Sequence, residues 1–496
     1  MTKNCLSVAM ALLLTFLLAA CSQDSDPGAK TTPPTDNPST AGTDTTDLSG
    51  DDGRDPDGDQ APLLLRYMAW DMGTEEENNG LGNVNRQMIE AFMDRYPHVT
   101  VEIVTVPLNA DGTDGNYGDY LNTLAAQQNL PDVFMWTSVT DTVARGWLSD
   151  VSEYALGDQD YLNVTQAMRE GGQVNGHVYG IPYAMFLQGM AVNFDIFDEL
   201  NVPYLPFSYS LEEMRQAMAN TTSASTRGSD NLNIQDWGTF VLSDDLGFFA
   251  FDGASYQFTR PEFAASVDFF RDLVARGHTG HGDFVEPWAP EGSWPWGDGY
   301  IALQLEASWA LPGFVNGERP FKADLMPLPN EKAIIIPDFI FIGANTQHPE
   351  WAYELAKWMS YGHDGQMTRL DIIPRTEGAG YPGIPLMAGH ISAVDDFFLE
   401  NYRPLENFIR LYGMLATHPQ NFVMEPLKVI PGYTQSRFEG DTGVIGTVDG
   451  EERSLSVDQL LTSILRGERQ LADYAAELSR ISTAEFERAS AQLSEY

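Results

Sequence analysis

The chain has 496 residues, of which 43% are hydrophobic and 11% aromatic, enough apolar material for the cores of several domains. It carries 71 Asp and Glu residues against 28 Lys and Arg residues, for a formal net charge of -43. Nucleic acids and anionic membrane surfaces bind clustered cations, so this charge argues against both as partners. The 2 cysteines, Cys5 and Cys21, lie near the N-terminus, so the remaining chain has no disulfide, cysteine nucleophile or thiolate metal site.

The first 20 residues are predicted to be a signal peptide. Lys3 makes the start positively charged, and residues 8–18 form an apolar run that is too short to span a bilayer comfortably. The run ends in LAAC at residues 18–21, which resembles the lipobox of bacterial lipoproteins, where the chain is cut before the cysteine. We expect lipids on Cys21 to anchor the protein at a membrane face. The alternative is an ordinary signal peptide with an incidental cysteine.

Residues 21–60, which begin with the lipidated cysteine, are predicted to form a disordered acidic tether. Asp, Thr, Pro, Gly and Ser dominate this segment, and large apolar side chains are almost absent. Such a composition buries too little surface to offset the entropy lost on ordering.

The body of the chain begins with alternating strands and helices. Strands are predicted at residues 63–70, 99–105 and 133–136, and helices at residues 84–95 and 120–128. This β-α-β-α-β order indicates a parallel sheet with right-handed crossovers. Ligands of such sheets bind beyond the carboxyl ends of the strands, where Trp70, Asp71 and Trp136 stand.

Three further helical segments are predicted later in the chain. Two of them begin at Pro261 and Pro349, because proline suits the first helical position and the glutamate that follows each proline favours the positive end of the helix dipole. The first should end at Arg276, before Gly277. The third is an amphipathic helical stretch over residues 456–493.

Several short motifs occur in an order that extends over almost all of residues 62–496. They are the strand end Trp70-Asp71 followed by Phe92, Tyr96 and Pro97; LPDV at 130–133; GWLSD at 146–150; VYGIP at 178–182; VNFDIF at 192–197; and GYIALQLEASW at 299–309. Together they resemble the extracellular solute-binding proteins of bacterial ABC importers, in the branch that includes maltose-binding protein. Asn129 and Val192 depart from the glycine and tyrosine that are usual in that family.

The resemblance implies an α/β fold of the type II periplasmic-binding-protein-like class. In this fold two α/β lobes, joined by crossover strands, close on a ligand in the cleft between them. Lobe 1 would comprise residues 61–184 and 343–373, and lobe 2 residues 185–342 and 374–496. Crossovers are expected near residues 183–189, 337–343 and 372–376.

A sugar has apolar C–H faces and a belt of hydroxyl groups, so its site needs aromatic platforms and polar partners. The aromatic candidates for ligand binding are Trp70, Trp136, Tyr183, Phe186, Trp294, Trp296 and Trp309. Trp309 coincides with the stacking tryptophan of the family. Core packing is the alternative for each tryptophan, and Tyr183 and Phe186 could equally belong to the core of the hinge.

The polar candidates for ligand binding are Asp71, Gln188, Glu306, Asp338 and Arg375. Asp71 follows the first strand, where the family often has a sugar-binding acid, and its alternative role is that of a turn aspartate. Asp338 and Arg375 lie at expected crossovers. Arg375 could bind hydroxyl groups or a carboxylate through its planar fork, or form a surface salt bridge instead.

The resemblance implies a monomeric receptor that binds a carbohydrate, expected to be an oligosaccharide, outside the cytoplasmic membrane and passes it to membrane permease subunits. Such a receptor is not an enzyme and needs no metal or cofactor. The sequence has no G-x-S-x-G, H-E-x-x-H or P-loop motif. Three alternatives stay open: the same fold binding a charged solute or peptide, a surface polysaccharide hydrolase, and a sensor that presents its ligand to a membrane kinase.

Overall fold

The computed structural model describes residues 61–72, 80–108, 115–230, 232–448 and 450–496. The predicted signal peptide, the lipidation of Cys21 and the tether lie outside these residues. Among the described residues, no helix combines the length and the apolar character that crossing a membrane requires.

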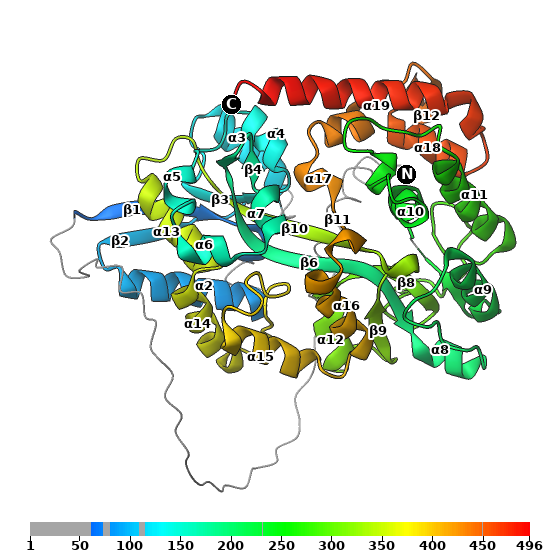
Figure 1. Cartoon of the computed structure of the whole chain (residues 1–496), viewed down its shortest axis with the longest axis horizontal. Helices are drawn as coiled ribbons and strands as arrows, with labels where there is room; N and C mark the ends of the chain where they lie inside the picture. Colours follow the sequence, from blue (N-terminus) through cyan, green and yellow to red (C-terminus); the bar gives the residue numbers. More distant parts are fainter. Residues whose placement is uncertain (1–60, 73–79, 109–114, 231, 449) are drawn as a thin grey trace, which may run out of the picture.

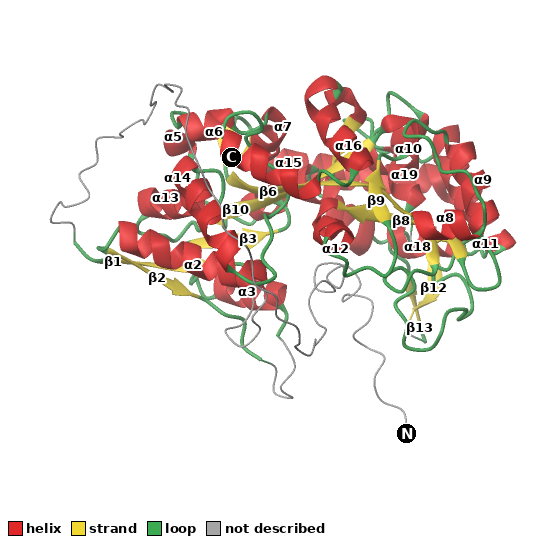
Figure 2. Ribbon diagram, turned by 90° about the horizontal axis from the view of Figure 1, so that it is seen from below, coloured by secondary structure: helices red, strands yellow, loops and turns green. Residues whose placement is uncertain are grey.

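A single mixed sheet of nine strands runs through both lobes (Figures 1 and 2). Seven strands follow one another across the sheet in the order β2 (Val99–Ile103), β1 (Leu63–Met68), β3 (Val133–Trp136), β10 (Ala333–Ile342), β6 (Gly180–Asn193), β8 (Ile301–Ala307) and β7 (Arg227–Ser229). The other two strands pair at the side of this series: β11 (Phe422–Met424) pairs with β10, and β9 (Ala323–Met326) pairs with β6. Two hairpins, β4–β5 (Gln173–Val174 and His177–Val178) and β12–β13 (Ile445–Val448 and Glu451–Ser454), stand apart from this sheet.

Lobe 1 is built on the β-α-β-α-β unit that the sequence predicts, and its three strands and two helices are confirmed. Strand β1 pairs in parallel with β2 and β3, as Leu63 opposite Val99 and Tyr67 opposite Val133 show. The helices that connect or cover these strands are α2 (Gly80–Arg95), α3 (Tyr117–Ala126), α4 (Val139–Ala144), α5 (Ser152–Ala155), α6 (Gln159–Asn163), α7 (Gln166–Gly171), α13 (Pro349–Met359) and α14 (His363–Ile372).

Lobe 2 surrounds a second hydrophobic core. Its helices are α8 (Phe194–Glu199), α9 (Leu211–Thr221), α10 (Ile234–Leu242), α11 (Pro261–Arg276), α12 (Leu311–Val315), α17 (Pro426–Val429) and α18 (Val457–Leu465). The boundaries predicted for α11 are confirmed, with Pro261 in its first turn and Gly277 in the left-handed conformation at its end. Helices α15 (Ser392–Tyr402) and α16 (Glu406–Thr417) lie against both lobes, because α15 contacts α14 and α12 while α16 contacts β9.

Two long strands, β6 and β10, connect the lobes (Figure 1). They pair antiparallel, with Gln188 opposite Ile334, Ala184 opposite Asp338 and Gly180 opposite Phe341. All ten residues of β10 are buried. The crossovers predicted near residues 183–189 and 337–343 fall within these two strands.

The third crossover predicted at residues 372–376 is wrong. Residue 372 ends α14, and a 3-10 turn, η5 (Ile373–Arg375), follows it. Ile372 and Ile373 are buried, which accounts for their apolar character without a strand. Arg369, fully buried in the same helix, holds α14 in place by donating to the carbonyl of Met359 at 2.9 Å and to Asn85 Oδ1 at 2.9 Å.

The C-terminal helical stretch predicted over residues 456–493 is two helices, because Gly467 adopts a left-handed φ of 78° after α18. The second, α19 (Leu471–Leu493), crosses from lobe 2 to lobe 1 along the upper edge in Figure 1. In lobe 2, Ser479 Oγ accepts from the backbone N–H of Phe258 at 2.9 Å. In lobe 1, Asn175 Nδ2 donates to the carbonyl of Leu493 at 2.7 Å.

Gly189 of β6 lies where β6 and the neighbouring strand β9 approach closely, so substituting it tests how closely the two strands pack. A Cβ atom added to Gly189 would lie 2.2 Å from the carbonyl oxygen of Met326, whereas one added to Gly413 in α16 would meet nothing within 4 Å. We expect Gly189→Ala to lower the free energy of unfolding by about 1–3 kcal/mol. Gly413→Ala should raise it by up to about 1 kcal/mol, because alanine favours the helix. Urea unfolding of both variants measures the difference, and equal stabilities would contradict the close strand packing.

Candidate functional site

Three aromatic rings gather at the carboxyl ends of β1 and β3. Trp70 begins the 3-10 turn η1 (Trp70–Met72) directly after β1, and Trp136 is the last residue of β3. The ring of Tyr117 stacks on Trp136 with centroids 6.3 Å apart and meets Trp70 edge-on at 5.7 Å. All three side chains are partly exposed. They form an apolar wall on lobe 1, which we call the Trp70 wall.

Sequence reasoning missed Tyr117. Its hydroxyl lies 3.1 Å from the carbonyl oxygen of Met68 and 3.0 Å from that of Met135, so it joins the ends of β1 and β3. In a β-α-β unit, the connecting helix begins at the edge of the sheet where the strand before it ends. Tyr117 begins α3, three residues before the helix predicted over residues 120–128, so the segment just before the predicted helix could have been placed beside the two tryptophans.

Asp71 faces the crossover strand β6. The hydroxyl of Tyr183 donates to Asp71 Oδ2, and Asn85 Nδ2 lies 3.4 Å from the Tyr183 hydroxyl. Burial raises the pKa of Asp71, and the hydrogen bond from Tyr183 and the charge of Arg369 oppose that rise. Among the described residues, Asp71 Oδ1 is buried without a hydrogen-bond partner. One carboxylate oxygen beside the Trp70 wall is therefore left to accept from a further donor.

A buried ion pair lies next to the Trp70 wall. Lys428 Nζ donates to Asp338 Oδ1 at 2.8 Å, and both residues are less than a tenth exposed. The same Nζ lies 5.9 Å from the centroid of the Trp70 ring. Burial alone would lower the pKa of Lys428, but Asp338 and Glu425 raise it above its usual value. Burial raises the pKa of Glu425, which Lys428 partly offsets. Asp338 is thus buried near the Trp70 wall and paired with a lysine that sequence reasoning missed.

Lobe 2 contributes a second aromatic pair. Phe186 of β6 meets Trp309 edge-on with ring centroids 5.5 Å apart. Trp309 Nε1 donates to Glu306 Oε1 at 2.8 Å, which fixes the orientation of the indole. Burial raises the pKa of Glu306, while hydrogen bonds from Ala307 and Trp309 counteract it. Gln188, partly exposed, lies opposite Ala307 on the neighbouring strand β8.

The remaining predicted residues lie outside these groups. Trp296 is 1% exposed and packs edge-on against Phe321 at 5.1 Å, within the core. Arg375 is exposed, and its Nε donates to the carbonyl of Asp371 at 2.6 Å at the end of α14. Trp294 is 46% exposed and has Arg319 over its ring.

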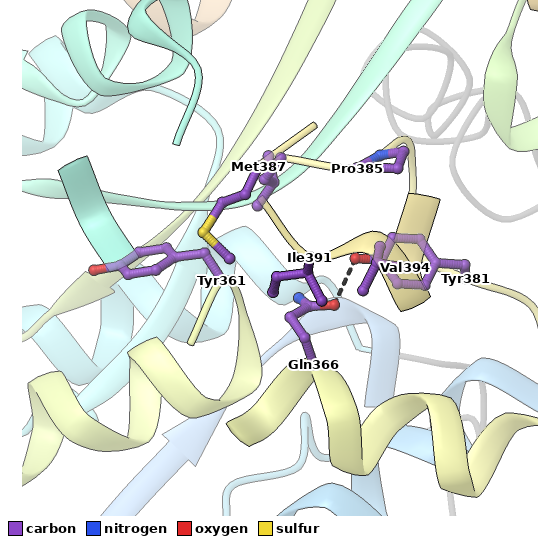
Figure 3. A pocket seen from close by; sticks show the side chains of 8 residues that line it. Tyr361, Gln366, Tyr381, Pro385, Met387, Ile391 and Val394 are labelled. Atoms are coloured by element: carbon purple, nitrogen blue, oxygen red, sulfur yellow. Dashed lines mark hydrogen bonds between the residues drawn. The ribbon is translucent and has the colours of Figure 1, made fainter. Parts of the chain in front are cut away.

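A separate cavity between α14 and the segment that leads into α15 is too small for a sugar. It has a volume of about 10 Å³, room for roughly one water molecule. Tyr361, Gln366 and Tyr381 line it, and the Tyr381 hydroxyl donates to Gln366 Oε1 at 2.5 Å (Figure 3). Among the described residues, no group of three or more His, Cys, Asp or Glu side chains could hold a metal ion.

The ion pair of Asp338 and Lys428 can be tested by a double-mutant cycle. Removing one partner leaves the other charge buried, so Asp338→Asn and Lys428→Met should each lower the free energy of unfolding by about 3–5 kcal/mol. The double variant should lose clearly less than the sum of the two single losses, because it leaves neither charge unpaired. Urea unfolding measures all four proteins. Strictly additive losses would show that the two side chains do not interact.

The raised pKa of Asp71 predicts a specific pH dependence of stability. In the unfolded chain Asp71 loses its proton near pH ~3.9, and in the folded protein it does so at higher pH. The folded state is therefore destabilised as the pH rises from about 4 through the folded pKa. Asp71→Asn cannot ionise, so its unfolding free energy relative to the unsubstituted protein should increase across that window and then level off. Denaturant unfolding at several pH values measures the difference, and a difference that does not change with pH would contradict burial as the cause.

The fold is shared with solved substrate-binding proteins. An ABC substrate-binding protein from Listeria monocytogenes, in complex with cycloalternan, aligns with 88% of this chain and 98% of its own at a TM-score of 0.60 and 16% identity. The cyclic alpha-maltosyl-1,6-maltose binding protein from Arthrobacter globiformis covers 86% of this chain and 100% of its own, with a TM-score of 0.61 and 17% identity.

A third structure is the galacto-N-biose/lacto-N-biose I-binding protein of the ABC transporter from Bifidobacterium longum, in complex with lacto-N-biose. It covers 87% of this chain and 99% of its own, with a TM-score of 0.58 and 15% identity. These likenesses confirm the type II fold of two α/β lobes. A search of curated proteins found no match.

The family is shown by the sequence itself. The model of the bacterial extracellular solute-binding protein family matches residues 83–361, more than half of the chain. The match includes most of lobe 1, both crossover strands and the segment with Glu306 and Trp309. The resemblance inferred from the sequence motifs is thereby confirmed: the chain belongs to the bacterial extracellular solute-binding proteins.

Proposed function

We propose that this protein is the substrate-binding component of an ABC importer and that it captures a carbohydrate in the cleft between its lobes. One observation carries the proposal: partly exposed aromatic rings stand on both lobes, as the Trp70 wall on lobe 1 and as Trp309 with Phe186 on lobe 2. Aromatic faces on two sides suit the apolar C–H faces of a sugar ring.

The polar side chains near these rings suit the hydroxyl groups of the sugar. The free Oδ1 of Asp71 and the carboxylates of Glu306 and Glu425 can accept hydrogen bonds from hydroxyl groups. Gln188 can both donate and accept. The proposed ligand-binding residues are Trp70, Asp71, Tyr117, Trp136, Tyr183, Phe186, Gln188, Glu306, Trp309, Asp338, Glu425 and Lys428.

The charges beside the Trp70 wall favour a neutral ligand over an anionic one. Asp338 balances the charge of Lys428, and Arg369 is fully buried and donates to Asn85 and Met359, so neither presents an unbalanced positive charge to a ligand carboxylate. The solved relatives support a carbohydrate, since they include proteins in complex with cycloalternan and lacto-N-biose. The expectation that the ligand is an oligosaccharide accords with both of those sugars.

The same proposal includes the setting in which the receptor works. Lipids on Cys21 would hold it at the outer face of a membrane through the tether of residues 21–60, as a monomer. Permease subunits of the importer would receive the sugar, and a separate cytoplasmic subunit would hydrolyse ATP. The receptor itself would bind and release the sugar without breaking a bond.

Thermal unfolding in the presence of sugars tests the proposal. The panel contains maltotetraose, a cyclic tetrasaccharide, lacto-N-biose and tagatose, together with a uronic acid oligomer and a peptide mixture. A sugar at ~100 times its Kd adds about 2.7 kcal/mol of stability, so the melting temperature should rise by a few degrees. We expect this rise with a neutral sugar, which should be recovered chemically unchanged.

Variants show whether the effect arises at the proposed site. Trp309→Ala should abolish the rise caused by the sugar. Trp351→Ala is the matched control, because Trp351 packs on Tyr96 and His98 away from the site. That variant should melt at a lower temperature yet keep the full rise. A rise only with the peptides or the uronic acid, or release of cleaved sugar, would contradict the proposal.

A further inference from the structure

Arg319 in lobe 2 is a charged side chain without an acceptor. Among the described residues, its guanidinium makes no hydrogen bond and no ion pair, and its Nε is buried without a partner. The guanidinium carbon lies 4.2 Å from the centroid of the Trp294 ring. A buried donor left unpaired is unfavourable, and more so when the group is charged. The Nε of Arg319 thus has no acceptor within the described residues, while the side chain as a whole is partly exposed and open to a ligand.

The place of Arg319 in the fold connects it to the proposed cleft. Helix α12 begins two residues after Trp309, and Arg319 follows the end of that helix. The backbone N–H of Arg319 donates to the carbonyl of Gly313 at 3.4 Å, which folds the chain back onto α12. Glu306, which holds the indole of Trp309, also acts on the charge of Arg319. Arg319 therefore lies near enough to Glu306 for their charges to interact, in the segment that follows Trp309 and α12.

Trp294 is held in place by its own loop and still faces solvent. Trp296, two residues later, is 1% exposed and anchors the loop in the core. The backbone N–H of Trp294 donates to Asp298 Oδ2 at 2.8 Å, and a Cβ added to Gly297 would come within 2.1 Å of the Trp294 ring. The indole is nevertheless 46% exposed. The loop thus presents a positioned aromatic ring with a guanidinium over it.

We propose that Trp294 and Arg319 form an outer subsite that takes a second or later sugar residue of a neutral oligosaccharide. The inference rests on the proposed function and extends it, because it assigns the receptor a ligand longer than the part held at Trp309. The indole supplies an apolar platform, and the guanidinium donates to neighbouring hydroxyl oxygens of the sugar.

The surroundings of Arg319 favour hydroxyl groups over a carboxylate. Glu306, Glu318 and Asp298 all act on the charge of Arg319, so a ligand carboxylate placed there would meet three negative charges of the protein. A hydroxyl oxygen accepts from the guanidinium without that repulsion. Burial lowers the pKa of Arg319, as expected for a charge that lacks a close acceptor.

The test is calorimetric titration of the full chain in mild detergent. The probes are the disaccharide and the hexasaccharide of the malto-, cello- and xylo-series, together with hexagalacturonate. Arg319→Ala and Trp294→Ala should each weaken the binding of a hexasaccharide about tenfold, in keeping with the loss of one charge-assisted hydrogen bond or one aromatic contact. Both should bind the matching disaccharide within twofold of the unsubstituted protein.

A matched control separates binding from structure. Arg227 also lies over a tryptophan, Trp288, at 4.5 Å, but its Nη1 donates to the carbonyls of Ser223 and Thr226 at 2.9 Å each. Arg227→Ala should therefore lower the melting temperature and leave the affinity for both sugars unchanged. Arg319→Ala should leave the melting temperature unchanged or raise it, because it removes an unpaired buried donor.

Several results would overturn the inference. Unchanged hexasaccharide affinity in Arg319→Ala and Trp294→Ala, or an equal loss for the disaccharide and the hexasaccharide, would remove the outer subsite while the proposed function stands. Tighter binding of hexagalacturonate than of every neutral hexasaccharide would overturn the neutral class of ligand. If the unsubstituted protein binds none of the neutral sugars, the proposed function fails together with the inference.

Discussion

The antiparallel pairing of β6 with β10 is the constraint on which the rest of the molecule depends. Residues of both strands belong to the hydrophobic core of lobe 1 and to that of lobe 2, so one sheet extends through both lobes. Their register sets Ala184 opposite Asp338 and Phe186 opposite Ile336. Side chains of the proposed site that lie on these strands are therefore fixed by backbone hydrogen bonds rather than by loops. A receptor built in this way can change the angle between its lobes while the middle of its site stays intact.

Charge is distributed at the site in a way that the net charge of -43 does not reveal. Lys428 is neutralised by Asp338, and Arg369 is surrounded by Asn85 and a backbone carbonyl. Burial raises the pKa of Asp71, which weakens its tendency to carry charge. Arg319 differs from these groups, because its guanidinium lies over the Trp294 ring and has no hydrogen-bond acceptor among the described residues. Acceptors on both lobes and one guanidinium on lobe 2 suit a ligand with many hydroxyl groups and no charge of its own.

Local patterns were enough to predict much of the fold. The alternating strands and helices of lobe 1 and the helix that begins at Pro261 are where the sequence places them. Because strand ends share one edge of a parallel sheet, Trp70 and Trp136 could be brought together from the sequence alone. The crossover expected at residues 372–376 came from the family resemblance, and the end of α14 and the 3-10 turn η5 occupy that segment instead. The break at Gly467 was missed although a glycine marked it.

The rest of the site depends on contacts between distant parts of the chain. Lys428 lies 90 residues from Asp338 and stands on a four-residue helix with no motif of its own. Whether a tryptophan packs or stays exposed is decided by its loop, as Trp294 and Trp296 show only two residues apart. The sequence likewise does not show that Arg319 Nε is unpaired, because this depends on the absence of a hydrogen-bond acceptor near Nε among the described residues. The lobe boundaries and the lipidation of Cys21 stay predictions.

A crystal structure of the protein with a bound neutral oligosaccharide would show where the ligand lies. We expect one oligosaccharide between the lobes, with a sugar ring in contact with Trp70 or Trp136 on one side and with Trp309 on the other. An oligosaccharide bound outside the region between β6, β10 and these tryptophans would contradict it. So would a ligand that touches one lobe only when the lobes are closed.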